Sequence, residues 1–165
     1  MSIVGISQGR HHSKGDEWYE MGQYHEAIAE YRKEMDTWYL RLRYNYKEAQ
    51  SLCGLAQCYG QLGQFEKARE TYLQMTAWFH GFYKERAEER LTDLDINLTE
   101  VDKYTKQIAE ASDDEMKASL IFDLALVYRR LKCSQKAIKQ YELIQALGVH
   151  EAWKQQAEGF AAGLR

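Results

Sequence analysis

The chain has 165 residues, and its 22 basic against 25 acidic side chains give a net charge of −3, which argues against a nucleic-acid binder that relies on phosphate contacts. Hydrophobic residues make up 45% of the chain, which excludes a largely disordered protein, and no apolar run approaches the roughly 20 residues that cross a bilayer. Proline is absent, and this favours helices joined by short turns.

The first predicted helical pair covers residues 11–42. Ser13, with Asp16 three positions later, predicts the start of its first helix. Gly22 predicts the end of that helix, because glycine readily takes the positive φ of a helix C-terminus. The second helix is indicated by apolar residues at steps of three and four: Ala27, Ile28, Tyr31, Met35, Trp38, Tyr39 and Leu42.

The second predicted pair, 48–80, repeats the first at a constant offset of 41 residues. The matched positions are Gly15/Ala56, Trp18/Tyr59, Gly22/Gly63, Tyr24/Phe65, Ala27/Ala68 and Tyr31/Tyr72. In each unit a small residue lies three or four positions before an aromatic one, which places both on one face of a helix. The repeat therefore predicts a helix–turn–helix unit whose small residues let neighbouring helices approach closely.

Two glycines, Gly54 and Gly60, lie inside the first helix of this second pair. Each should cost about 1 kcal/mol relative to alanine, so each needs a reason. Close packing of helices is one explanation, and the approach of a ligand to the exposed backbone is the other.

Residues 82–111 carry a weaker pattern, which we interpret as a degenerate helical pair. Two apolar stripes, one from Ala87 to Leu94 and one from Leu98 to Ala111, are separated by Asp95 and Asn97, and both residue types are common in turns.

The fourth predicted pair covers residues 115–148 and repeats the second pair at an offset of 69 residues. The matches include Ala56/Ala125, Tyr59/Tyr128, Ala68/Ala137 and Tyr72/Tyr141, whereas Lys132 and Ser134 replace the glycine and the aromatic residue of the turn. A last helix at 150–163 carries its apolar residues on one side, and we expect it to cap the array.

These repeated positions resemble the tetratricopeptide repeat (TPR), whose pattern of small residue, aromatic, Gly-x-aromatic, alanine and aromatic is met twice in full. The first copy is Gly15, Trp18, Gly22, Tyr24, Ala27 and Tyr31, and the second is Ala56, Tyr59, Gly63, Phe65, Ala68 and Tyr72. The resemblance implies an all-α fold: a right-handed TPR-like α-solenoid of about four helix–turn–helix pairs plus a C-terminal capping helix, forming a single domain over residues 1–165.

The offset of 41 exceeds the family's usual 34 by seven residues, or about two helical turns. We expect longer second helices, so that Trp38, Tyr39 and Leu42, and then Trp78, Phe79 and Phe82 one unit later, form an aromatic edge. The alternative is an ordinary repeat followed by a seven-residue loop. If left open, such an edge would serve as a surface for a partner or for a homodimer.

In TPR arrays the first helix of each pair lines a concave surface, so the resemblance also implies a peptide-binding groove. Its residues would be Asp16, Tyr19, Gln50, Gln57, Gln61, Phe122, Asp123, Leu126, Arg129 and Arg130. The equivalent positions lack the Lys and Asn residues with which some TPR domains clamp a C-terminal carboxylate.

The sequence contains no HExxH, GxSxG, Walker or dinucleotide-binding motif, and His11 and His12 have no third ligand nearby. We therefore expect neither an enzyme nor a bound cofactor or metal. Cys53, Cys58 and Cys133 are odd in number and form no CxxC motif, and the N-terminus does not resemble a secretory signal, so we expect a cytoplasmic protein.

The leading functional hypothesis is an adaptor or scaffold that binds a protein or peptide partner without nucleic acid or membrane. A dedicated chaperone of a secreted or assembly partner is one alternative, and an RNA-associated regulatory protein is another.

Overall fold

A computed structural model of the chain describes residues 13–38 and 46–165. Within these ranges every regular secondary-structure element is a helix. The helices are α1 (Lys14–Glu20), α2 (Tyr24–Trp38), α3 (Tyr46–Gln61), α4 (Phe65–Trp78), α5 (Phe82–Glu110), α6 (Asp114–Arg130), α7 (Ser134–Gln145) and α8 (Glu151–Ala162).

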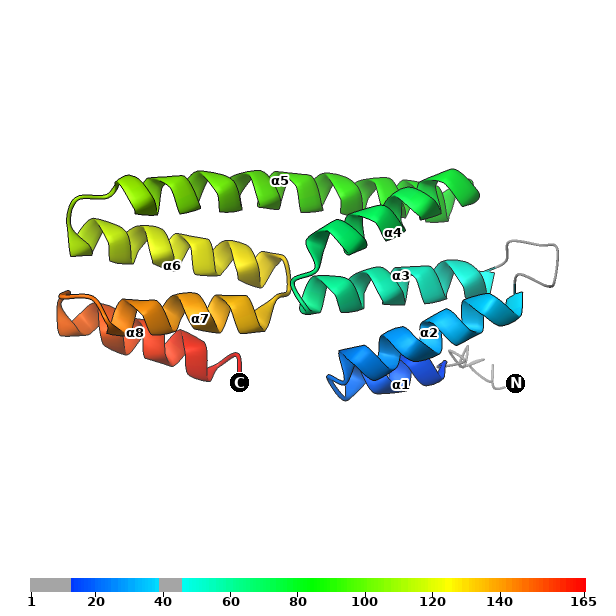
Figure 1. The fold of residues 1–165 in the computed structure, drawn as a ribbon, viewed down its shortest axis with the longest axis horizontal. Coiled ribbons are helices and arrows are strands. Elements are labelled where there is room, and N and C mark those ends of the chain that lie inside the picture. Colours follow the sequence, from blue (N-terminus) through cyan, green and yellow to red (C-terminus); the bar gives the residue numbers. More distant parts are fainter. Residues whose placement is uncertain (1–12, 39–45) are drawn as a thin grey trace, which may run out of the picture.

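Each helix packs against the next one in the chain, so that the array grows by successive helical hairpins (Figure 1). Helices α1–α4 form one half of the molecule and α6–α8 form the other, while α5 runs along both. The described parts of the first, second and fourth predicted pairs correspond to α1–α2, α3–α4 and α6–α7, and α8 follows as the last helix. Residues 11–12 and 39–42 of the first predicted pair lie outside the described ranges.

The turns between paired helices confirm the glycine prediction. Gly22 has a φ of 72° and Gly63 a φ of 68°. At Gly63 the backbone N–H donates to the Gly60 carbonyl at 2.9 Å, which closes the end of α3. In the third turn Lys132 takes the same conformation, with a φ of 57°, although it lacks the conformational freedom of glycine. The third turn therefore has the same backbone geometry as the first two, although it lacks their glycine.

The predicted helical pair at 82–111 is wrong, because α5 is one continuous helix of 29 residues. Asp95 and Asn97, expected in a turn, lie in its middle. Polar side chains here bond back to the helix instead of interrupting it: Asn97 Nδ2 donates to the Asp93 carbonyl at 2.6 Å, and Thr99 Oγ1 donates to the Asp95 carbonyl at 2.9 Å. No glycine or proline occurs between 82 and 111 to break the helix.

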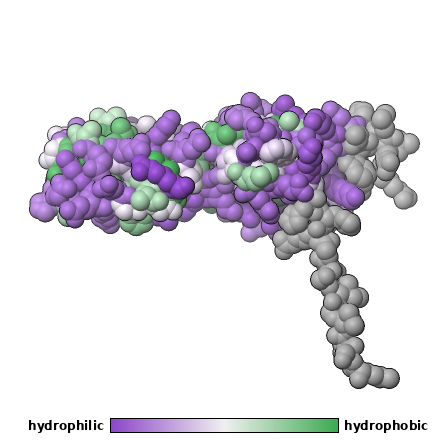
Figure 2. Space-filling view, turned by 90° about the horizontal axis from the view of Figure 1, so that it is seen from below, coloured by the Kyte–Doolittle hydropathy of each residue, from purple (hydrophilic) through white to green (hydrophobic). Residues whose placement is uncertain are grey.

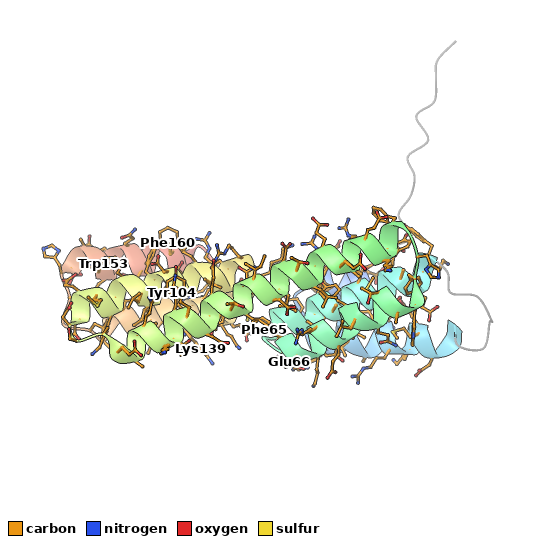
Figure 3. All side chains as sticks on the ribbon, turned by 90° about the horizontal axis from the view of Figure 1, so that it is seen from above. Phe65, Glu66, Tyr104, Lys139, Trp153 and Phe160 are labelled. Carbon is orange, nitrogen blue, oxygen red and sulfur yellow. The ribbon has the colours of Figure 1, made fainter. Side chains whose placement is uncertain are left out.

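The continuous helix α5 serves both halves of the molecule. Near its start, Ala87 packs with residues of α3 and α4, and Leu94 joins the core around Tyr59. Near its end, Ile108 packs against the core formed by α6, α7 and α8. Seen from above, α5 crosses the array diagonally, from one edge of the first half to the opposite edge of the second (Figure 3).

The small residues of the first half make room for one aromatic ring. Tyr31 is almost fully buried, and its hydroxyl donates to Asp16 Oδ1 at 2.6 Å. A Cβ atom added at Gly15 would lie 2.5 Å from this ring, and one added at Gly54 would lie 2.6 Å from its hydroxyl oxygen. Close packing therefore explains Gly54. It does not explain Gly60, where an added Cβ would meet only a carbonyl oxygen at 3.9 Å.

The two halves also meet directly, at the turn between α3 and α4 and the turn between α6 and α7. The Cys133 thiol donates to the Gln61 carbonyl at 3.4 Å, and the Lys136 ammonium donates to the Gly63 carbonyl at the same distance. The ammonium also lies 4.6 Å from the ring centre of Phe65, which Figure 3 places near the middle of the array. We call this contact the junction.

A pair of equivalent tyrosines gives a stability prediction. Among the described residues, the Tyr141 hydroxyl is the buried side-chain polar atom that lacks a hydrogen-bond partner, whereas the equivalent Tyr31 is bonded. We expect Tyr31→Phe to lower the free energy of unfolding by about 1 kcal/mol, and Tyr141→Phe to leave it unchanged or raise it by up to about 1 kcal/mol. Urea denaturation of both variants checks this, and equal losses would contradict it.

Candidate binding groove

A groove runs along α3, between α1 and the first half of α5. It consists of two adjoining cavities of about 310 and 420 Å³, which share Tyr19 and Gln57. The polar and aromatic residues that line it are Asp16, Tyr19 and Glu20 from α1, Tyr31 from α2, Tyr46, Gln50, Cys53, Gln57 and Gln61 from α3, Phe65 and Tyr72 from α4, Phe82, Tyr83, Arg86, Arg90, Asp93 and Asn97 from α5, and Arg130 and Lys132 at the far end.

The floor of the groove is one face of α3, because its lining residues recur at steps of three and four. Their polar groups are linked to each other and to α1. Gln50 Nε2 donates to the Tyr46 hydroxyl at 2.6 Å, and Gln61 Nε2 donates to the Tyr19 hydroxyl at 3.3 Å. The floor is therefore neutral and rich in amides.

The α5 wall of the groove carries two arginines one turn apart. The charges of Arg86 and Arg90 both lower the pKa of the Cys53 thiol in the floor, against the larger raising effect of its burial. Within the part of the chain that the structure describes, neither guanidinium forms an ion pair with a carboxylate. Elsewhere arginines do so: Arg69 pairs with Asp95 at 3.1 Å, and Arg130 pairs with Glu100.

An aromatic cluster occupies the end of the groove nearest the start of α3. We call it the aromatic end and define it as Tyr46, Phe79, Phe82 and Tyr83. The ring centres of Tyr46 and Tyr83 are 5.9 Å apart, and those of Phe82 and Tyr83 are 5.3 Å apart. Tyr46 is 59% exposed and Phe82 is 63% exposed, although both are large and apolar.

This cluster corrects the prediction of an aromatic edge built by extended second helices. Helix α4 ends at Trp78 and does not continue to Phe82, because Gly81, with a φ of 58°, turns the chain into α5. In the first unit the described part of α2 extends to Trp38, and Tyr39 and Leu42 lie outside the described residues, as does the Trp38 side chain. The exposed aromatic surface instead belongs to the groove.

The ten residues predicted to line one concave surface fall into three places. Asp16, Tyr19, Gln50, Gln57 and Gln61 line the groove. Asp123, Leu126 and Arg129 line a separate cavity between α5 and α6, and Arg130 borders both. Phe122 lies in neither.

Phe122 belongs to an aromatic core beneath α8. Its ring centre is 5.3 Å from that of Tyr141 and 5.2 Å from that of Phe160. The Arg129 guanidinium lies over the Phe160 ring at 5.2 Å, so it covers this core. Figure 3 shows Phe160 and Trp153 together at one edge of the second half. The prediction that Phe122 is a groove residue is therefore wrong, because α8 covers the face of α6 on which it lies.

The α5 wall was missed by the sequence reasoning, because 82–111 was divided into two short helices. The signal was present: the apolar residues Ala87, Leu91, Leu94, Leu98 and Val101 follow steps of three and four without a break. An uninterrupted helix would have placed Arg86, Arg90, Asp93 and Asn97 on a neighbouring stripe.

Seen from below, the described surface carries hydrophobic residues in separate patches on the two halves, among mostly hydrophilic ones (Figure 2). Within residues 13–38 and 46–165, no helix has the length and apolar character that a membrane span requires. Nor does this part of the chain gather three His, Cys, Asp or Glu side chains as a metal ion would need.

The cysteines differ in how deeply they are buried. Cys58 and Cys133 are fully buried, and burial raises the pKa of the Cys58 thiol to about 12. Cys53 is half-buried in the groove floor; burial also raises the pKa of its thiol, while Arg86 and Arg90 lower it. The pKa of the Cys53 thiol therefore reports on the charges of Arg86 and Arg90.

Arg86→Gln is expected to make the Cys53 thiol less reactive. Loss of the cation removes an influence that lowers the pKa of the Cys53 thiol, so its pKa rises and less thiolate exists at a given pH. Alkylation of Cys53 by iodoacetamide, followed by mass spectrometry at pH 8, should therefore become slower. Arg165→Gln, far from the groove, should leave the rate unchanged. An unchanged rate in Arg86→Gln would show that its guanidinium does not lie beside the thiol.

Residues 18–77 match the sequence profile of the family described as tetratricopeptide repeat. This match runs from within α1 to the end of α4, which is the half that holds both glycine turns and the groove floor. No curated protein and no solved structure matches the chain. The matched profile agrees with the helical hairpins of α1–α4, and residues 18–77 are similar to tetratricopeptide repeats.

Proposed function

We propose that this protein is a non-catalytic adaptor that binds a segment of a protein partner in the groove along α3. Tetratricopeptide repeats generally mediate protein–protein interactions. The observation that carries the proposal is the continuity of the groove: two cavities joined at Tyr19 and Gln57 extend from Tyr46 at one end of α3 to Gln61 at the other.

The size of the groove suits a peptide better than a small molecule. The 16 residues of α3 span about 24 Å. A fully extended chain covers this length with about seven residues. The amides of Gln57, Gln61 and Asn97 offer donors and acceptors to a peptide backbone without demanding a charge. Such a surface is suited to binding a peptide in an extended conformation.

Gly60 offers a way to block the groove without disturbing the core. It borders the groove, and the space beside it is open, so Gly60→Leu should direct a side chain into the groove while favouring the helix. Gly159 in α8, in the other half of the molecule, provides the matched control, because an added Cβ there meets nothing within 4 Å.

The experiment selects random heptapeptides displayed on phage against the wild-type protein. Selected peptides should bind the wild type and Gly159→Leu equally, and they should lose binding to Gly60→Leu. Circular dichroism should show that both variants keep their helix content. If no peptide is enriched, or if the enriched peptides bind Gly60→Leu as well as the wild type, the groove is not a peptide-binding site.

A further inference from the structure

The arginines of the α5 wall are the starting point, because their charges are unbalanced within the described residues. Arg86 and Arg90 are four residues apart on one helix, an arrangement in which like charges repel. Both line the groove, and neither has a carboxylate partner among the described side chains. A pair of guanidinium groups held side by side in a groove is suited to a carboxylate, which each can bind through two parallel hydrogen bonds.

The opposite wall carries two carboxylates, Asp16 and Glu20, and among the described side chains neither forms an ion pair with Arg86 or Arg90. Asp16 already accepts hydrogen bonds from the Tyr31 hydroxyl at 2.6 Å and from the Ser13 backbone N–H at 3.1 Å. These bonds hold Asp16 to its own hairpin, where it caps α1. Arg86 and Arg90 are thus available to bind a ligand, whereas the Asp16 carboxylate stabilises the α1–α2 hairpin.

The aromatic end lies directly beside Arg86. The Arg86 guanidinium is 5.9 Å from the ring centre of Phe82, the most exposed large apolar residue among those described. Tyr46 faces Tyr83 across the end of the groove. Exposed aromatic rings next to a cation offer an apolar surface and a positive charge close together. Two neighbouring side chains of a ligand can contact both.

We propose that the segment bound in this groove carries an acidic side chain adjacent to an aromatic or large aliphatic one. The carboxylate binds Arg86 and Arg90, and the apolar side chain packs against Phe82 and Tyr46. This inference rests on the proposed function and specifies the chemistry of the partner. An acidic peptide segment fits better than nucleic acid, because the floor of the groove consists of neutral amides, Arg130 at its far end already pairs with Glu100, and the chain's net charge is −3.

The test uses the heptapeptide selection described above, repeated on three further proteins. The double variant Arg86→Gln/Arg90→Gln removes both charges from the groove. Arg165→Gln is the control for the loss of an arginine, since Arg165 pairs with Glu142 in the other half. Phe82→Ser removes the exposed ring and should leave the core intact, because Phe82 is mostly exposed.

We expect peptides selected by the wild type and by Arg165→Gln to be enriched in Asp or Glu next to Phe, Trp or Leu. The double variant should lose the acidic preference, and Phe82→Ser should lose the apolar one. A synthetic peptide from the selected set should bind about tenfold more weakly when its acidic residue is replaced by Gln or Asn, as expected for a lost charge-assisted bond. Fluorescence anisotropy measures this affinity, which should also fall as salt concentration rises.

The outcomes separate this inference from the proposed function. Peptides that bind the wild type, fail on Gly60→Leu and carry no acidic preference would leave the groove as a peptide site and overturn the inference. Selected peptides that bind the double Arg variant as tightly as the wild type would overturn it too. Failure to select any peptide would overturn both. Tighter binding of single-stranded RNA than of any selected peptide would assign the arginines to nucleic acid instead.

Discussion

Replacing Gly54 by alanine is expected to lower the free energy of unfolding by about 3 kcal/mol, at the upper end of the usual cost of overpacking a core. The added methyl group would collide with Tyr31, which is held on its other side by Gly15 and is hydrogen-bonded to Asp16. The ring is almost fully buried, so it cannot shift far without disturbing the residues packed around it. Either α3 moves away from α2 or the bond to Asp16 breaks.

Gly60→Ala is the matched control for this prediction. Gly60 lies in the same helix, six residues later, and an added Cβ meets no tight contact. Alanine should therefore raise the free energy of unfolding by up to about 1 kcal/mol, through helix propensity alone. Urea denaturation curves of both variants measure the difference. If Gly54→Ala proves as stable as Gly60→Ala, then Tyr31 does not lie between the two helices as described.

Ala27→Leu is the second change for which we expect a large effect, a loss of about 2–3 kcal/mol. Ala27 is 0% exposed, in the core that it shares with Tyr31 and Cys58, and a leucine there has no room. The equivalent Ala68 is also buried but borders the groove, so Ala68→Leu should cost less because part of its side chain can enter that space.

Ala29→Leu controls for the effect of a leucine on the same helix, since Ala29 is exposed two residues later. Its free energy of unfolding should stay within about 0.5 kcal/mol of the wild type. Thermal unfolding followed by circular dichroism is sufficient to compare the three variants. Equal melting temperatures for Ala27→Leu and Ala29→Leu would contradict the packing described for α2.

The sequence predicted the first half of the fold well, because local signals and packing agree there. Ser13 and Asp16 form the predicted capping box, and Gly22 and Gly63 adopt the positive φ that ends their helices. Such features depend on a few neighbouring residues, so the pattern of residue types is sufficient to find them. The continuity of α5 was less visible, because Asp95 and Asn97 favour turns on average, whereas here their neighbours' side chains and packing on both halves keep the helix intact.

The candidate site was predicted only in part for the same reason. The residues of α1 and α3 were identified from their place in the repeat, and the structure brings them together. Arg86, Arg90 and Phe82 come from a segment where the repeat pattern fails, so no repeat position pointed to them. Phe122 was misassigned because a repeat position does not reveal that α8 covers it.

Helix α5 also ties the length of the chain to the geometry of the whole array. One residue inserted into its middle would rotate everything beyond it by about 100° and shift it by about 1.5 Å, so that its two apolar stripes would no longer face their separate cores. Seven inserted residues would nearly restore the rotational phase but would lengthen the helix by about 10 Å, and Lys136 could then no longer reach Gly63 across the junction. The length of α5 therefore sets both the distance and the rotation between the two halves. Insertions and deletions that a turn tolerates are excluded from this helix.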